Sequence, residues 1–408
     1  MNKKANNFNT FFKFLLVFIL ILFTYLNQDK IVETGNKVYN ASKQISENNK
    51  FNFTNKEIIY NLNENITEPL TYSFCPSQDC LILLNSSFNN AKKEIKCAFY
   101  ELDNKVLSQT LLEKSKTNQI NISLVIEDNY IDEKSLNILY NTSIKIYSNL
   151  GISNKYMHHK FCVIDDQILI TGSTNPTDNG IFKNNNNLIK FNSNYLSQNY
   201  ENEFDQLTSG KYSRDKISTL IYNNISLNYY PNYDINIITN NTTNINNTNI
   251  NNTNINNANI HTNIQNQSYE ISTYFCPQDN CKKELINTIN SAKKEILFAN
   301  FALTLDDLKI ALQNKSKEGI KIEGIVEKRN FNLQGSDVKE LNKTFPIHED
   351  KNKYNMHHKF FIIDELYIIT GSMNPSNNGV NYNDENIIII KNRDLALNFK
   401  KEFYKMLN

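Results

Sequence analysis

The segment MHHKFCVIDDQILITGSTNP, from Met157 to Pro176, recurs as MHHKFFIIDELYIITGSMNP, from Met356 to Pro375. Both copies keep the spacing H-x-K-x4-D-x6-G-S-x-N without a departure. In the first copy two apolar runs flank Asp165 and Asp166, a pattern typical of two strands joined by a tight turn. A second string, AKKEI, precedes each motif at Ala91–Ile95 and Ala292–Ile296. The chain therefore contains an internal duplication.

Two α/β halves are predicted around these motifs. Each copy opens with a strand-like run ending at Cys-Pro, continues with a helix-like stretch and returns to apolar strands, an alternation typical of α/β layers. We expect the halves at residues 69–223 and 271–408. Between them, Ile235–Ser268 contains no Lys, Arg, Asp or Glu and consists mostly of Asn, Ile and Thr. Such a tract buries too little apolar surface to order itself, so residues 224–270 are predicted to be an Asn-rich linker.

An apolar run near the first residue predicts a targeting segment. Lysines precede Phe14–Leu26, which is short for a permanent span but typical of the apolar part of a secretory signal. The residues after it offer no small-x-small cleavage site, which favours a signal anchor over a cleaved signal peptide within residues 1–30. We expect residues 31–68 to be a polar, poorly ordered stalk. The protein would then be membrane-anchored with its catalytic halves outside the cytoplasm, or alternatively secreted.

The cysteines fit an oxidising compartment. The spacing Cys-Pro-x-x-x-Cys occurs twice, at Cys75 to Cys80 and at Cys276 to Cys281. A zinc site would need two more convergent ligands in each case, so a local disulfide in each half is the favoured interpretation. Cys97 and Cys162 align with phenylalanines of the second copy, and we expect them to be buried apolar residues.

The overall charge favours no single class of partner. The 408 residues carry 43 Lys and Arg against 42 Asp and Glu, a net charge of +1. No strong overall field therefore draws the chain to nucleic acid or to an anionic membrane. Hydrophobic residues make up 40% of the chain, which is enough to bury cores and excludes a wholly disordered protein.

Four of the six histidines lie in the two motif copies. Because side chains alternate along a strand, His158 and Lys160 project from one face, and His159 from the other. We therefore interpret His159 and its counterpart His358 as packed side chains. Donors for an anion are expected from the hydroxyls and amides that follow each motif, namely Ser173, Asn175, Ser372 and Asn374.

If the two copies face each other, two imidazoles flank a pocket that contains Lys160 and Lys359. Such a pocket suits a phosphodiester, since in-line displacement needs a nucleophile on one side of phosphorus and a proton donor on the other. Histidine can fill both roles near neutral pH, because its unperturbed pKa is about 6.5. A metal site is the competing interpretation, but two lysines would repel the ion. We therefore expect no metal and no cofactor.

The paired motifs resemble those of the phospholipase D superfamily, over roughly Thr71–Asn223 and from Ser272 onward. The resemblance implies two similar α/β/α sandwich halves related by a pseudo-twofold axis, with one active site between them. It also implies a covalent phosphohistidine that water hydrolyses without a metal. In this family the motif aspartates, here Asp165 and Asp364, are mainly structural.

One position breaks the symmetry between the halves. Glu385 stands 21 residues after Asp364, where compact members of the family carry a carboxylate that supports a histidine, whereas the first half has Asn186. By resemblance the carboxylate reaches the histidine of the other half, which makes His158 the nucleophile and His357 the general acid and then base. A solvated loop acid is the alternative for Glu385. The candidate catalytic residues are His158, Lys160, Asp165, His357, Lys359, Asp364 and Glu385.

Three functions are compatible with this constellation. The favoured one is phospholipase D-type hydrolysis that releases a headgroup from membrane phospholipid, consistent with the apolar N-terminal segment. The alternative is an endonuclease that cleaves DNA or RNA, because the short halves resemble the compact nuclease and cardiolipin-hydrolase branch. A non-catalytic binding protein on the same fold is disfavoured, since both motifs are intact.

Overall fold

The structure is a computed structural model that describes residues 58–117, 120–151, 155–230, 266–331 and 336–408. Most of the expected Asn-rich linker and the expected targeting segment lie outside these residues. Among the described residues, no helix is both long enough and apolar enough to cross a bilayer.

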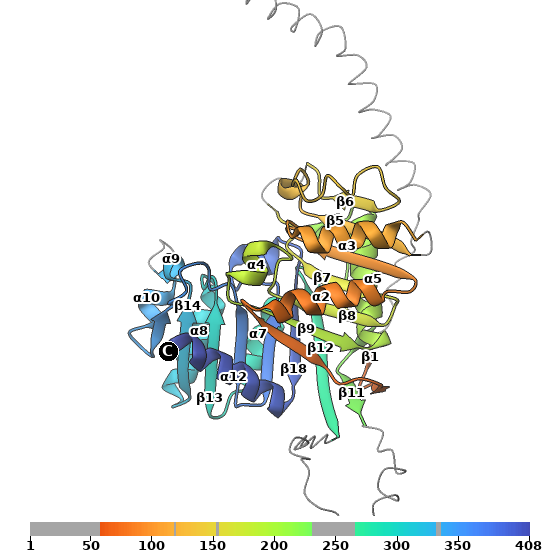
Figure 1. Cartoon of the computed structure of the whole chain (residues 1–408). Coiled ribbons are helices and arrows are strands. Elements are labelled where there is room, and N and C mark those ends of the chain that lie inside the picture. Colours follow the sequence, from red (N-terminus) through yellow and green to blue (C-terminus); the bar gives the residue numbers. More distant parts are fainter. Residues whose placement is uncertain (1–57, 118–119, 152–154, 231–265, 332–335) are drawn as a thin grey trace, which may run out of the picture. The chain divides into compact units, whose positions relative to one another are not determined.

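The first half is a mixed sheet with helices on its faces (Figure 1). Its strands, in the order in which they pair, are β3 (Thr71–Cys75), β9 (Asn186–Asn192), β8 (Ile168–Gly172), β7 (Lys160–Ile164), β4 (Glu94–Phe99), β5 (Asn121–Ile126) and β6 (Lys145–Ser148). Its helices are α2 (Gln78–Asn90), α3 (Lys105–Ser115), α4 (Asp178–Phe182) and α5 (Asn194–Thr208).

The second half repeats this topology. Its strands, in the corresponding pairing order, are β12 (Gln267–Cys276), β18 (Glu385–Lys391), β17 (Tyr367–Gly371), β16 (Lys359–Ile363), β13 (Glu295–Asn300), β14 (Lys321–Val326) and β15 (Ile347–Glu349). Its helices are α7 (Cys281–Asn290), α8 (Asp306–Lys317), α9 (Lys328–Phe331), α10 (Val338–Leu341), α11 (Asn377–Asn381) and α12 (Arg393–Leu407). The duplication in sequence is therefore a duplication of the fold.

The second sheet is extended by strands from outside the repeat. Strand β11 (Ile225–Tyr229) pairs antiparallel with β12, and β2 (Asn63–Ile66) pairs parallel with β11. A small separate pairing joins β1 (Ile59–Tyr60) to β10 (Tyr222–Asn223). The expectation of a poorly ordered stalk is therefore wrong for its last residues, and both ends of the expected linker range are strands. Backbone pairing orders these segments together with burial of Ile66, Ile225 and Leu227 in an apolar core.

The two motif hairpins turn as the sequence predicts. In the first turn, Asp165 and Asp166 have φ of 56° and 59°, which matches the left-handed residues of a tight two-residue hairpin. The Asp165 carboxylate also accepts the backbone N–H groups of Lys92 and Lys93, each at 2.7 Å. Asp364 makes the equivalent bonds in the second half. The motif aspartates thus bond each hairpin to the residues that lead into β4 or β13.

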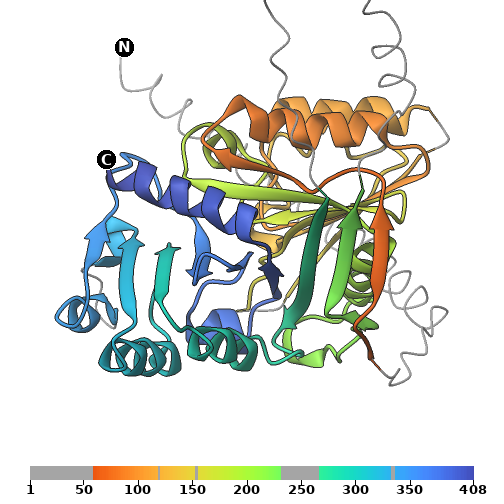
Figure 2. The same ribbon diagram turned by 90° about the horizontal axis from the view of Figure 1, so that it is seen from below.

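Three apolar cores hold the chain together. One core in each half lies between the sheet and its outer helices, α2 and α3 or α7 and α8. The third core contains residues of both sheets with α5 and α12. Figure 2 shows α12 running across the strands of the second half. Because the halves share this third core, burial of apolar surface joins them into one folded unit.

The six cysteines form three disulfides. Cys75–Cys80 and Cys276–Cys281 are the two local pairs expected from their spacing. The interpretation of Cys97 and Cys162 as simply buried apolar residues is wrong, because they are bonded to each other. They are cross-strand partners on β4 and β7, which brings their backbones within disulfide reach, with 4.1 Å between Cα atoms. Within the described residues no cysteine is free.

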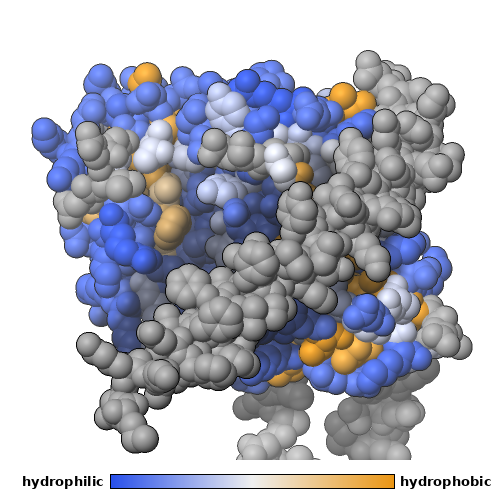
Figure 3. Space-filling view, turned by 90° about the horizontal axis from the view of Figure 1, so that it is seen from above, coloured by the Kyte–Doolittle hydropathy of each residue, from blue (hydrophilic) through white to orange (hydrophobic). Residues whose placement is uncertain are grey.

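The face of the protein seen in Figure 3 is mostly hydrophilic, with hydrophobic residues in small separate patches.

Candidate active site

The two motif segments are held by backbone contacts between the halves. The His158 N–H donates to the carbonyl of Asp384 at 2.9 Å, and the His357 N–H donates to the carbonyl of Asn185 at 2.9 Å. Each motif histidine therefore lies against the residue that precedes Glu385 or Asn186 in the other half. This reciprocal pairing brings both histidines to the junction of the two sheets.

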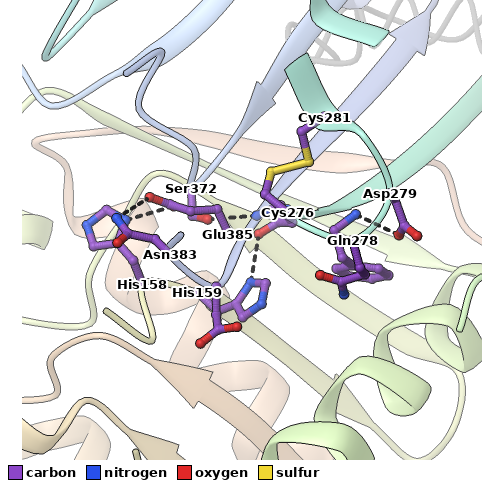
Figure 4. The surroundings of a disulfide bond; sticks show 12 residues. His158, His159, Cys276, Gln278, Asp279, Cys281, Ser372, Asn383 and Glu385 are labelled. Carbon is purple, nitrogen blue, oxygen red and sulfur yellow. Dashed lines mark hydrogen bonds and ion pairs between the residues drawn. A yellow bond between two sulfur atoms is a disulfide. The ribbon is translucent and has the colours of Figure 1, made fainter. Parts of the chain in front are cut away.

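His158 is held by the carboxylate of the second half. Its Nδ1 lies 2.8 Å from Glu385 Oε2, and the Glu385 side chain is fully buried. Figure 4 shows Asn383 and Ser372 beside this pair. Because Nδ1 is engaged, Nε2 is the ring nitrogen left for chemistry. The alternative of a solvated loop acid for Glu385 is thereby excluded.

His357 has an amide in the equivalent position. Its Nδ1 lies 2.9 Å from Asn186 Oδ1. The Asn186 Nδ2 donates to the Gly180 carbonyl at 3.0 Å, so Oδ1 is the atom that faces the ring. His357 must therefore donate from Nδ1, which leaves Nε2 as its reactive nitrogen. An amide fixes this orientation without the charge that Glu385 supplies to His158.

Each motif lysine is buried and tied to its own histidine. Lys160 Nζ donates to the His158 carbonyl at 2.8 Å, and Lys359 Nζ donates to the His357 carbonyl at 2.9 Å. Burial lowers the pKa of Lys160 to about 7 and lowers the pKa of Lys359 well below its usual range. Two cations in one enclosed site are costly, and an anion between them would offset that cost.

Burial also lowers the pKa of both motif histidines well below 6.5, and both lysines add to the effect. The lysine of each half lowers the pKa of the histidine of the other half, so the four groups form one electrostatic cluster. Burial raises the pKa of Glu385 to about 7.

Aromatic rings pack on both histidines. The Tyr100 and His158 rings are 4.6 Å apart, and the Phe301 and His357 rings are 5.2 Å apart, each pair edge to face. Lys160 Nζ lies 5.2 Å from the centroid of Tyr100. These aromatic residues follow β4 and β13 in equivalent positions, so the two halves build the same support around each imidazole.

The motif serines hydrogen-bond to the residues that hold the two histidines. Ser173 donates its hydroxyl to Asn186 Oδ1 and accepts the backbone N–H of Asn187, both at 3.0 Å. Ser372 accepts the backbone N–H of Asn386 at 3.0 Å and hydrogen-bonds to Glu385. The one hydroxyl hydrogen of each serine is thus used, which differs from the phosphate-binding role expected from the sequence.

The motif asparagines differ from the serines. The Asn175 Oδ1 and Asn374 Oδ1 atoms are buried and have no hydrogen-bond partner among the described residues. Asn175 also lines a cavity beside His357. Asn175 and Asn374 therefore stay candidates for contact with the substrate.

His159 and His358 are fully buried, in agreement with their interpretation as packed side chains. His159 Nε2 lies 2.9 Å from Glu203 Oε1. Glu203 also pairs with buried Lys216, which reaches Asp384 at 2.8 Å. The network ends at the residue whose carbonyl binds the His158 backbone. Glu203, Lys216 and Asp384 all lie outside the motif copies, so the motif spacing did not reveal them.

Two buried glutamates that the motifs did not reveal bind the backbone at the start of each motif. Glu127 Oε2 accepts the Met157 N–H at 2.7 Å, and Glu327 Oε2 accepts the Met356 N–H at 2.8 Å. Both carboxylates are buried. A glutamate directly follows β5 and β14, at Glu127 and Glu327. These two residues are 200 positions apart, close to the 199 that separate the motif copies, and this repeat is the signal in the sequence that could have found them.

Comparisons with known proteins agree with this geometry. The family model described as "Cardiolipin synthase, PLD-like domain" matches residues 84–208 and again residues 285–407. Phospholipase D of Rickettsia conorii is 31% identical over 138 residues, which are 33% of this chain and 69% of that protein. Mitochondrial cardiolipin hydrolase of Chlamydomonas reinhardtii is 27% identical over 122 residues, 30% of this chain. The match spans about half, 55%, of that relative's length.

A solved structure shares the fold. Phosphatidylserine synthase of Haemophilus influenzae matches with a TM-score of 0.55 and 12% identity, over 81% of this chain and 84% of that one. At this identity the match concerns the fold alone. The family model covers more than half of the chain through two copies of one domain, each with an intact motif, and the chain therefore belongs to the phospholipase D superfamily.

Proposed function

We propose that the protein is a phosphodiesterase that hydrolyses a phosphodiester through a phosphohistidine on His158. The observation that carries this proposal is the unequal support of two otherwise equivalent histidines. His158 Nδ1 contacts the buried Glu385 carboxylate, whereas His357 Nδ1 contacts the Asn186 amide. A carboxylate makes its imidazole the better nucleophile, and an amide leaves the other imidazole the better acid.

In the first step, His158 Nε2 attacks phosphorus while the bond from phosphorus to the leaving oxygen breaks. The leaving oxygen takes a proton from His357 Nε2, so the products are an alcohol and a phosphohistidine. As the N–P bond forms, positive charge develops on the His158 ring, and Glu385 lies at Nδ1 to stabilise it.

In the second step, His357 acts as a base. Its Nε2 takes a proton from water, the water oxygen bonds to phosphorus, and the N–P bond breaks with its electron pair returning to His158. Both histidines end in their starting protonation states.

The lysines stabilise the non-bridging oxygens of phosphate in both steps. In the free site, burial lowers the pKa of His158 well below 6.5 and both lysines add to this effect, so His158 stays neutral and therefore nucleophilic. Arrival of an anionic phosphate offsets the charge of Lys160 and Lys359, which lets His357 regain the proton that it donates. The same lysines disfavour a divalent cation in this place by direct repulsion.

Phospholipid is the favoured substrate, with release of its headgroup. Support comes from the relatives, which include proteins named phospholipase D and mitochondrial cardiolipin hydrolase. The apolar run at Phe14–Leu26 would place the enzyme at a membrane, with its catalytic halves outside the cytoplasm or in a secreted form. Cleavage of DNA or RNA at the same site is the alternative.

The experiment incubates the full chain with phospholipid vesicles and with single- and double-stranded nucleic acid, each in the presence of EDTA. Headgroup release that a His158→Ala variant lacks is the expected result. Cleavage of nucleic acid alone would replace the lipid assignment by the nuclease. Loss of all activity on chelation would contradict the metal-free mechanism.

A further inference from the structure

A cavity of about 430 Å³ opens beside His357 and is basic on one side. Lys328, Arg329 and Lys353 of the second half line it, and among the described residues around it Glu101 is the one carboxylate. Burial raises the pKa of Glu101 to about 7, so this carboxyl is partly neutral near physiological pH. The cavity therefore attracts negative charge.

The arginine of this cavity is held in place by a buried group. Arg329 Nε donates to Glu327 Oε1 at 2.9 Å, while the Arg329 side chain remains 62% exposed. The other oxygen of Glu327 accepts the Met356 N–H, directly before His357. One buried carboxylate thus sets the position of both Arg329 and the catalytic segment.

The lysines are arranged around an aromatic ring and a backbone carbonyl. Lys353 Nζ lies 5.2 Å from the centroid of Tyr354, and Lys183 Nζ lies 5.4 Å from the same centroid. Lys328 Nζ donates to the Asn352 carbonyl at 3.2 Å. These contacts hold Lys353 and Lys183 at the ring of Tyr354 and Lys328 at the Asn352 carbonyl.

Two of the three basic residues that line the cavity have no basic counterpart in the first half. Asp128 and Asn129 follow Glu127 where Lys328 and Arg329 follow Glu327. Around His158 the structure has aromatic side chains instead, with Tyr100 packed on both Tyr130 and Tyr156. At these two positions the halves therefore differ in charge, although they share one fold.

We infer that Lys328, Arg329 and Lys353 bind a second anionic group, carried by the leaving group of the substrate. The inference rests on the proposed function, in which His357 protonates the leaving oxygen. In-line displacement places the leaving group on the side of His357, which is the side of the basic cavity. The preferred substrate is thus a phosphodiester whose leaving alcohol bears another phosphate.

The test compares substrates that differ by one phosphate in the leaving group. Soluble dihexanoyl phosphatidylglycerol and its glycerol-phosphate form are the lipid pair, and TpT and pTpT are the nucleotide pair, in which the added phosphate lies on the nucleoside whose 3′ oxygen leaves. Soluble substrates avoid the general attraction of charged vesicles. We expect kcat/KM to be at least about tenfold higher for the phosphorylated member of one pair, and the advantage to shrink with ionic strength.

The variants Lys353→Gln and Arg329→Ala are expected to bring that ratio towards one, mainly through KM. Arg329→Lys retains the charge and should keep most of the preference, which controls for disturbance of Glu327. Asn129→Ala, at the equivalent position of the first half, should keep the wild-type ratio.

Equal kcat/KM for the two members of every pair that is hydrolysed would overturn this inference and leave the proposed function intact. An unchanged ratio in both Lys353→Gln and Arg329→Ala would do the same. If none of the four substrates is hydrolysed, the proposed function itself is overturned. The pair that shows the preference identifies the source of the second phosphate as lipid or nucleic acid.

Discussion

Cys276 is the cross-strand partner of Glu385, so the Cys276–Cys281 disulfide closes a loop directly beside the carboxylate that holds His158 (Figure 4). The first half repeats the relationship, because Cys75 pairs with Asn186 and is bonded to Cys80. Each local disulfide thus lies next to the residue that orients the histidine of the other half.

The first prediction concerns this disulfide. Replacing Cys276 and Cys281 together by serine should reduce kcat by about tenfold, because Glu385 loses part of the restraint that orients it. Stopped assays on a variant shown by circular dichroism to be folded check the effect. A folded double variant with wild-type kcat would show that the disulfide does not position Glu385.

The second prediction concerns pH. Burial raises the pKa of Glu385 to about 7, and His158 needs the carboxylate form, which is lost as the pH falls through that value. Wild-type kcat/KM should therefore decrease below about pH 7. Glu385→Gln should be slower by about 10²-fold and should lack this acidic limb, since glutamine does not titrate. If the variant kept the same limb, another group would be responsible for it.

The third prediction uses the amide that supports His357. Asn186→Asp places a carboxylate at nearly the same position, which raises the pKa of His357. Because His357 donates a proton in the first step, the alkaline limb of kcat/KM should move up by about one pH unit. A shift confined to the acidic limb would assign the acid role to another residue.

The fourth prediction concerns the buried lysines. Lys359→Ala should reduce turnover by about 10²–10³-fold, because the non-bridging oxygens lose one of their two cations. Lys401, exposed on α12, provides a matched control in which the same substitution should have little effect. Near-normal rates in a folded Lys359→Ala variant would refute the assigned role.

The sequence predicted the parts of the site that the duplication makes visible. The two motifs and the turns at Asp165 and Asp364 follow from repeated residues at constant spacing. The contact of Glu385 with the other half was an expectation from the resemblance to the family, because Asn186 breaks the repeat at this position. The contact of His357 with Asn186 became visible only in the structure.

The features that the sequence did not reveal depend on register and on loops. Cys97 and Cys162 correspond to Phe298 and Phe361, which are also cross-strand partners, so their bond becomes visible only once the strands are aligned. Asn63–Ile66 is a mostly polar strand whose order comes from pairing with β11, from burial of Ile66 and from bonds of Glu64 to the start of α5. Lys216 reaches Asp384 from a segment without a repeat signal.

The most direct test is to trap the covalent intermediate. The full chain would be mixed with substrate, quenched in alkali within one turnover, digested and mapped by mass spectrometry for phosphorylated histidine. We expect the adduct on His158, its accumulation in a His357→Ala variant supplied with an activated leaving group, and its absence in His158→Ala. An adduct on His357 in the wild-type protein, or turnover without any adduct on histidine, would refute the assignment of His158 as the nucleophile.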